Sequence, residues 1–183
     1  GFDMTDPAIV KMFVLADRKK PLPKVIEKLH VLPLSLSYEF DPCDVLKAKE
    51  LSTIALEGRY KKPPGEDLVS LVRGLGGQKG QVVLRLGTPL DGEFETPKDV
   101  ALEIDRQILT NLELFPVNYW ALSRLDEPEY RSLHKEVGIT IGQRDALALA
   151  NRLKKCPPGF RPYWLKIYAN PVVNRHRVLN QLP

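Results

Sequence analysis

The 183-residue sequence has few cysteines and no long apolar run. Its two cysteines, Cys43 and Cys156, show neither C-x-x-C spacing nor histidines at metal-ligand spacing, so we expect no metal site and no disulfide framework. Two free thiols are typical of a reducing compartment such as the cytosol. No apolar stretch approaches the roughly 20 residues of a membrane-spanning helix, and no signal peptide opens the sequence. These absences favour a cytoplasmic protein.

Several common motifs of catalysis and binding are also absent. No predicted strand is followed by G-x-S-x-G, the pattern of a serine nucleophile. The glycines of residues 74–80 follow a predicted helix rather than a strand, so they indicate a helix end and a turn and not a phosphate loop. The basic segments 18–20 and 61–62 have no interleaved aromatics, which favours solvated faces over a nucleic-acid groove. We therefore expect no nucleic-acid partner.

The composition fits a folded domain with a mild basic excess. Hydrophobic residues make up 43% of the chain, which is enough for a continuous core. Lys and Arg number 27 against 23 acidic residues, a net charge of +4. That excess suits contact with anionic phosphates or a membrane surface without requiring nucleic acid. The length fits one domain with a helical appendage.

Two strands and several helices are predicted from periodicity and turn chemistry. Residues 31–40 alternate as a strand, with Leu32, Leu34, Leu36 and Tyr38 on the side expected to be buried and Pro33 at the strand's start or on an edge. Residues 81–86 form the second strand. Helices are expected from Thr5-Asp6-Pro7, with Ile9, Phe13 and Ala16 as apolar face, and from Thr96-Pro97, capped by Thr96 with Asp99 and carrying an apolar stripe. That stripe comprises Ala101, Ile104, Ile108, Leu112 and Phe115. Further helices are expected at 25–29, 43–60, from 66, and at 118–125, 129–137, 143–156 and 163–168.

These elements predict an α/β fold: a partial small sheet flanked by helices, with a helical C-terminal segment. The sequence opens at Gly1 without a cap or strand, so we expect a piece of a longer protein whose remaining strands lie upstream. We divide it into an α/β part at 1–115 and a helical extension at 116–183. The aromatic and basic segment 160–168 is compatible with docking at a membrane interface or with packing onto the core, and the burial habits of aromatics favour packing.

The three histidines are the obvious acid–base candidates, and each has an ordinary structural interpretation. His30 ends a short helix, where a cap is expected. His134 lies on a charged helix face, and His176 lies in a basic tail. We expect none of them to be catalytic.

Residues 5–12 and 32–39 resemble the later part of bacterial 1-acylglycerol-3-phosphate acyltransferase-like proteins. Residues 60–67, 80–89 and 168–172 are also similar to this branch, so the resemblance spans nearly the whole chain. In that family the fourth sequence block is a strand written as apolar-Pro-apolar with a following Tyr. Pro33 matches this block directly.

The resemblance implies an acyltransferase of phospholipid biosynthesis. Its acyl donor would be acyl-CoA or acyl carrier protein, with no other cofactor, and its acceptor a lysophospholipid-type hydroxyl. Pro33 would line the substrate cleft, and Ser35, Ser37 and Tyr38 are inferred as substrate-binding because they lie beside it. Thr5 and Lys11 are weaker candidates for the same role. Peripheral contact with the inner face of the membrane would accompany a cytoplasmic location.

The sequence departs from the family where the chemistry would occur. In the family the base is a His separated from an Asp by four residues, and none of the three histidines has Asp five positions on. Glu57-Gly58-Arg59 imitates the family's phosphate-gripping Glu-Gly-x-Arg, but it follows the proline strand and lies in a predicted helix, so we interpret it as coincidence. We therefore assign no catalytic residue, and expect the parent protein rather than this chain to be the complete enzyme. The alternative is a non-catalytic interaction or lipid-binding domain.

Overall fold

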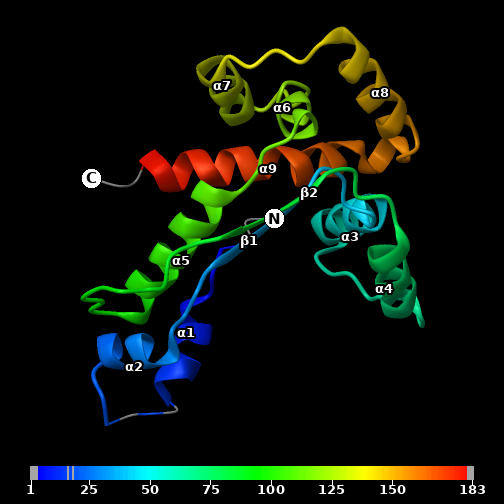
Figure 1. The fold of residues 1–183 in the computed structure, drawn as a ribbon. Coiled ribbons are helices and arrows are strands. Elements are labelled where there is room, and N and C mark those ends of the chain that lie inside the picture. The colour runs from blue at the N-terminus through cyan, green and yellow to red at the C-terminus, as the bar shows by residue number, and fades with distance from the viewer. Residues whose placement is uncertain (1–3, 16, 18, 181–183) are drawn as a thin grey trace. The chain divides into compact units, whose positions relative to one another are not determined.

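The computed structural model describes residues 4–15, 17 and 19–180, and these are mostly helical (Figure 1). Helices account for 62% of the described residues, and two strands pair in one antiparallel sheet. A helix-rich fold with a small sheet is therefore confirmed. None of the described helices combines the length and apolar character needed to cross a membrane. In chain order the elements are α1 (Pro7–Leu15), α2 (Leu22–Leu29), β1 (Leu34–Tyr38), α3 (Asp44–Glu57), α4 (Glu66–Gly76), β2 (Val82–Leu86), α5 (Pro97–Asn111), α6 (Pro116–Leu122), α7 (Pro128–Val137), α8 (Gln143–Lys154), the 3-10 turn η1 (Pro158–Phe160) and α9 (Arg161–Asn180).

The chain forms two compact units that are interleaved in sequence. The helical unit comprises Tyr38–Val82 and Leu114–Val173, and so holds α3, α4, α6, α7, α8 and the first part of α9. The strand unit comprises Val83–Glu113 with residues 4–37 and 174–180, and so holds α1, α2, α5 and most of both strands. The predicted boundary between an α/β part at 1–115 and a helical extension at 116–183 stays a prediction. The outer ends of these two parts, residues 1–3 and 181–183, lie outside the described residues.

In the strand unit, α1 packs against α2 and α5 around a small apolar cluster. The predicted apolar face of α1 is wrong, because Ile9 and Phe13 are exposed while Val10 is fully buried. Ala16, the third residue of that predicted face, lies outside the described residues. Ile9 and Val10 are adjacent and both apolar, so periodicity alone allowed either face of this short helix to turn inward. The buried members of the cluster are Val10, Ile26, Leu90, Val100 and Ala101.

Helix α5 begins as the sequence predicts. The Thr96 hydroxyl accepts a hydrogen bond from the Asp99 backbone N–H (3.3 Å), and the Asp99 carboxylate accepts one from the Thr96 N–H (2.7 Å). This reciprocal pair satisfies two backbone donors that the first turn of a helix otherwise leaves free. The predicted stripe is confirmed through Ile108, but its last two members, Leu112 and Phe115, lie beyond the helix end at Asn111.

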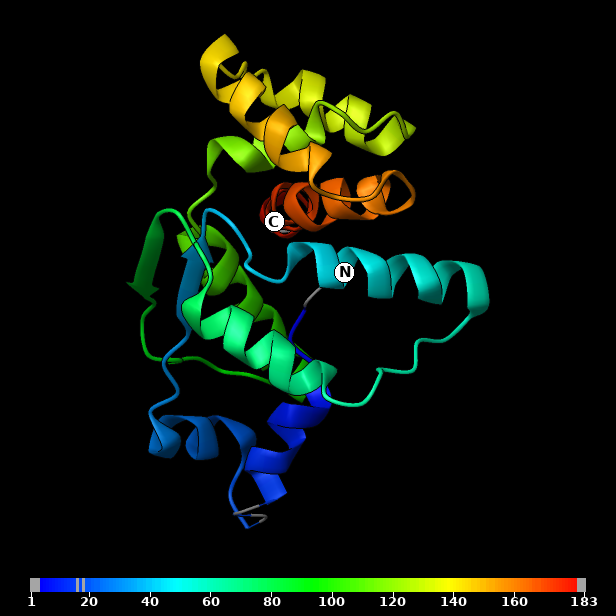
Figure 2. The same ribbon diagram turned by 90° about the vertical axis from the view of Figure 1, so that its right-hand side faces the viewer.

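In the helical unit, α6, α7 and α8 lie on the same side of the first part of α9 in both views (Figures 1 and 2). Its core is aromatic: Trp120, Trp164 and Tyr168 are buried, and the rings of the last two lie 4.4 Å apart. The largest rings of the aromatic segment of α9 therefore pack into the core of the helical unit. Helix α9 is also far longer than predicted, because it continues through Pro171 rather than ending before it.

Candidate functional site

The strand that carries most of the predicted site residues is confirmed, but its orientation is opposite to the prediction. Ser35 and Ser37 are the buried side chains of β1, at 2% and 4% exposure, whereas Leu34, Leu36 and Tyr38 are exposed. Alternation identifies a strand but does not say which face is covered. The predicted apolar-inward face is therefore wrong, and the two serines do not line an open surface.

The buried face of β1 is held by specific hydrogen bonds within the strand unit. The Ser37 hydroxyl accepts a bond from the Glu113 backbone N–H (2.9 Å). The Ser35 hydroxyl is buried and has no partner among the described residues. Pro33 lies just before the strand, as predicted, and its carbonyl accepts a bond from the Gly87 N–H (2.8 Å). A Cβ at Gly87 would collide with the end of the Gln107 side chain, which would have to shift to admit it.

Thr5 and Lys11, the two weaker candidates, are not brought to this strand by any hydrogen bond of the described residues. The Thr5 hydroxyl donates to the Asp105 carboxylate of α5 (2.7 Å), and the Thr5 N–H donates to the same oxygen (2.9 Å). This pins the start of α1 to α5, which is a structural role. Lys11 is exposed on α1.

The outward face of the sheet is an apolar ladder, which we call the open face. The Gly87 N–H binds the Pro33 carbonyl and the Glu39 N–H binds the Gln81 carbonyl, and these two bonds fix an antiparallel register. In that register Leu34 lies opposite Leu86, and Leu36 opposite Leu84. These are non-hydrogen-bonded pairs, in which cross-strand side chains come closest. Leu36 and Leu84 remain 43% and 58% exposed, so an apolar surface of the strand unit faces solvent.

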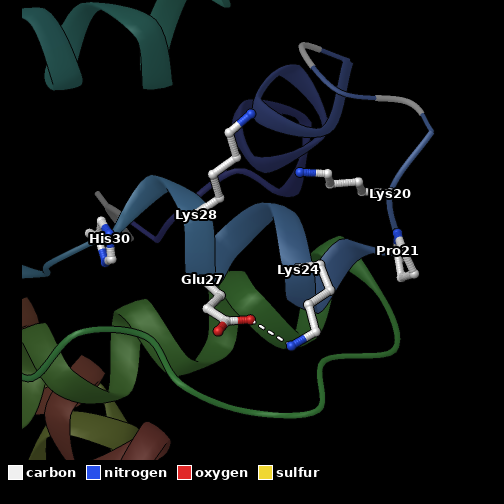
Figure 3. Close-up of a pocket in the computed structure, with 6 residues that line it drawn as sticks. All are labelled: Lys20, Pro21, Lys24, Glu27, Lys28 and His30. Carbon is white, nitrogen blue, oxygen red and sulfur yellow. Dashed lines mark hydrogen bonds and ion pairs between the residues drawn. The ribbon is translucent and has the colours of Figure 1, made fainter.

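A basic hollow of about 500 Å³ lies on α2, also within the strand unit (Figure 3). Lys24 donates to Glu27 (2.8 Å), and this bond raises the lysine pKa and lowers the glutamate pKa. Lys20 and Lys28 both lie near the Asp17 carboxylate, at 3.6 and 3.4 Å. Exposed ion pairs of this kind contribute little and leave scant charge for a ligand. We interpret the hollow as a solvated face, as we also expect for the neighbouring basic segment 18–20. Arg18 of that segment lies outside the described residues.

The histidines occupy structural positions. His30 ends α2 in the left-handed conformation, with φ of 50°, and its N–H donates to the Glu27 carbonyl, so the predicted cap is confirmed. His134 lies in the last turn of α7, and the His176 ring lies beside the Asn180 amide (2.9 Å). Gly58, in the sequence that imitates a phosphate grip, ends α3 with φ of 75°, which is the ordinary use of a glycine at a helix C-terminus.

The helical unit contains a buried polar network that the sequence did not reveal. The Asp44 carboxylate accepts bonds from Tyr168 (2.8 Å) and Arg152 (3.0 Å), and the Asp41 N–H donates to the Tyr168 oxygen (3.0 Å). The Arg152 guanidinium also lies 4.3 Å from the Phe40 ring centroid. Burial, and next the Asp44 charge, raise the pKa of Tyr168 well above its usual value. We assign this network a structural role, since it ties the start of α3 to α8 and α9.

The described part of the chain contains no assembled site for metal binding or for thiol chemistry. No three His, Cys, Asp or Glu side chains of residues 4–15, 17 and 19–180 converge as metal ligands. Cys43 and Cys156 are both free, and burial raises the pKa of each thiol. Both therefore stay protonated near neutral pH.

Comparison with known proteins returned no relative. No family model, no curated protein and no solved structure matches this chain.

Proposed function

We propose that this chain is part of an acyltransferase that moves a fatty acyl group from acyl-CoA or acyl carrier protein to a glycerophospholipid-type hydroxyl. The proposal starts from the sequence blocks that resemble the 1-acylglycerol-3-phosphate acyltransferase family, above all the proline strand. It includes a cytoplasmic location with peripheral contact at the inner face of the membrane.

The observation that carries the proposal is the open face. Its paired leucines, Leu34 with Leu86 and Leu36 with Leu84, are the kind of apolar surface against which an acyl chain is buried. Exposed apolar patches on soluble proteins commonly mark sites that bind a ligand or another surface. Within this proposal the leucines of β1 take the lining role that the sequence assigned to Ser35 and Ser37, whose side chains face inward.

The chemistry requires a base that this sequence does not contain. In the family that the chain resembles, a histidine deprotonates the acceptor hydroxyl, whose oxygen then attacks the thioester carbonyl carbon. The carbon–sulfur bond breaks, and the thiol leaves with a proton. Because no histidine here is followed by Asp at the family's spacing, we place the base elsewhere in the parent protein. This chain then contributes the substrate cleft and not the proton transfer.

A second candidate is a non-catalytic interaction or lipid-binding domain. The observation that favours it is helix α4, which has no buried residue and exposes an apolar stripe at helical spacing. Such a stripe is typical of a helix that docks onto another surface. The stripe comprises Leu68, Leu71, Val72 and Leu75.

The test begins with the gene. We expect an in-frame His-x-x-x-x-Asp followed by Glu-Gly-x-Arg upstream of the codon for Gly1. A start codon at or next to Gly1 would remove the enzyme proposal in favour of the interaction domain. The full gene product should transfer radiolabelled acyl groups from acyl-CoA or acyl carrier protein to lysophosphatidate.

A matched pair of variants then links transfer to the open face. Leu36→Gln should lower the transfer rate about tenfold, because a buried leucine contributes about 1.5–3 kcal/mol of apolar contact. Leu56→Gln, at an exposed leucine of α3, should leave the rate unchanged. Equal rates for the two variants would show that the open face does not hold the acyl chain.

A further inference from the structure

A second concave surface lies wholly within the helical unit, between α6, α8, η1 and the start of α9. Its volume of about 520 Å³ is within the range of small-molecule sites. We call it the α8–α9 pocket. Its principal lining residues are Trp120, Leu153 and Leu165, which are apolar, and Arg124, Lys154 and Arg161, which are basic.

The pocket has an apolar floor. Trp120 and Leu165 are buried in the core, and Leu153 is half-buried in the last turn of α8. The Trp120 indole N–H is buried and has no hydrogen-bond acceptor among the described residues. A tryptophan beside leucines gives a rigid surface for a hydrocarbon body.

The rim of the pocket is basic and has no acidic residue. The Arg124 guanidinium lies 5.3 Å from the Trp120 ring centroid, and Lys154 donates only to the Asn151 side chain (3.2 Å). Arg161 donates to the backbone carbonyl of Cys156 (3.0 Å). None of the three cations forms an ion pair with a carboxylate of the described residues, which distinguishes them from Lys20, Lys24 and Lys28 of the basic hollow.

The charge pattern of the sequence reinforces this local excess. After Asp145 the chain has seven Lys or Arg residues and no Asp or Glu. Two of the seven are neutralised within the helical unit, Arg152 by Asp44 (3.0 Å) and Lys166 by Glu127 (2.7 Å). Lys154 and Arg161 keep their charge, and they border the pocket at the N-terminus of the 20-residue helix α9, where the helix dipole also favours an anion.

We propose that the α8–α9 pocket binds an anionic amphiphile, with a carboxylate or phosphate head between Arg124, Lys154 and Arg161. The apolar body lies against Trp120, Leu153 and Leu165. The assignment follows from a pocket that combines three cations without a carboxylate and an apolar floor. It does not depend on the acyltransferase proposal, which concerns the open face of the other unit.

The test uses the 183-residue chain and four probes measured by calorimetry: decanoate, decyl phosphate, 1-decanol and inorganic phosphate. Decanoate or decyl phosphate should bind at least tenfold more tightly than 1-decanol, which has the same chain without charge. Each should also exceed inorganic phosphate, which has charge without the chain. The ratio of decanoate to decyl phosphate identifies the preferred head. The proposal is overturned if neither decanoate nor decyl phosphate binds more tightly than 1-decanol.

Variants locate the site. Lys154→Gln should weaken decanoate binding about tenfold, the loss expected for one charge-assisted hydrogen bond. Arg144→Gln, on an exposed turn of the same helix and outside the pocket lining, should bind as the parent chain does. If Lys154→Gln binds like Arg144→Gln while Leu36→Gln loses binding, the ligand lies on the open face; that result overturns this proposal and supports the acyl cleft instead.

Discussion

In the helical unit the largest apolar side chains are inside, whereas in the strand unit the apolar side chains of the sheet are outside. Trp164 is 1% exposed and packs on Tyr168, while Leu84 of β2 remains largely open. The difference shows that the helical unit buries its large aromatic rings, whereas the face of a two-stranded sheet that becomes buried depends on which segment packs against it.

Truncation of the buried ring should give the largest effect. Trp164→Ala should lower the free energy of unfolding by about 3–5 kcal/mol, because it leaves a large cavity in the core. Leu84→Ala on the open face should change it by no more than about 0.5 kcal/mol. Urea denaturation followed by far-ultraviolet circular dichroism measures both. Similar losses for the two variants would mean that the open face is covered in solution.

Removal of the buried cation should give the next effect. Arg152→Ala should destabilise the chain by about 3 kcal/mol, because the Asp44 carboxylate stays buried without its guanidinium partner. Arg144→Ala, at an exposed position of the same helix, is the control and should cost no more than about 0.5 kcal/mol. Urea denaturation followed by tryptophan fluorescence suits this pair, since Trp120 and Trp164 both lie in the helical unit. An equal loss of unfolding free energy for both variants would mean that the network stabilises the fold no more than a surface contact does.

The same network predicts a loss of stability at alkaline pH. The folded pKa of Tyr168 is raised above its unfolded value near 10, so the folded state keeps a proton that the unfolded state releases. This stabilisation is complete below pH 10 and is lost above it, at about 1.4 kcal/mol per pH unit until the folded pKa is reached. Tyr168→Phe should flatten that part of the dependence. Tyr38→Phe is the control at an exposed tyrosine, and an alkaline slope that it removed instead would contradict the assignment.

Local signals in the sequence predicted local structure well. The cap of Thr96 and Asp99, the glycine turns and both strands were found because each depends on residues a few positions apart. The network of Asp44, Arg152 and Tyr168 was missed because its partners lie 108 and 124 positions apart, and no periodicity links them. The length of α9 was missed because Pro171 normally interrupts a helix.

The candidate site was predicted in part for the same reason. Pro33 was placed correctly at the start of its strand, since a proline cannot donate to the ladder. Ser35 and Ser37 were assigned to an open cleft because they lie near Pro33 in sequence. They share the face of Pro33, as the period of a strand requires, but that face is the buried one. The inward face is instead marked by the bond from the Glu113 N–H to the Ser37 hydroxyl, whose partners lie 76 positions apart.

The two serines of β1 give the finest test of this comparison. Ser37→Ala should cost about 1 kcal/mol, because the Glu113 N–H loses its acceptor in a partly buried place. Ser35→Ala removes a buried hydroxyl that has no partner, so it should cost nothing or stabilise slightly. Both are small side chains on one face of one strand, so backbone propensity and lost volume cancel between them. Urea denaturation followed by circular dichroism measures the difference, because the strand unit contains no tryptophan. A larger cost for Ser35→Ala would mean that its hydroxyl has an acceptor or donor in solution, and the inward face of β1 would then be a binding surface after all.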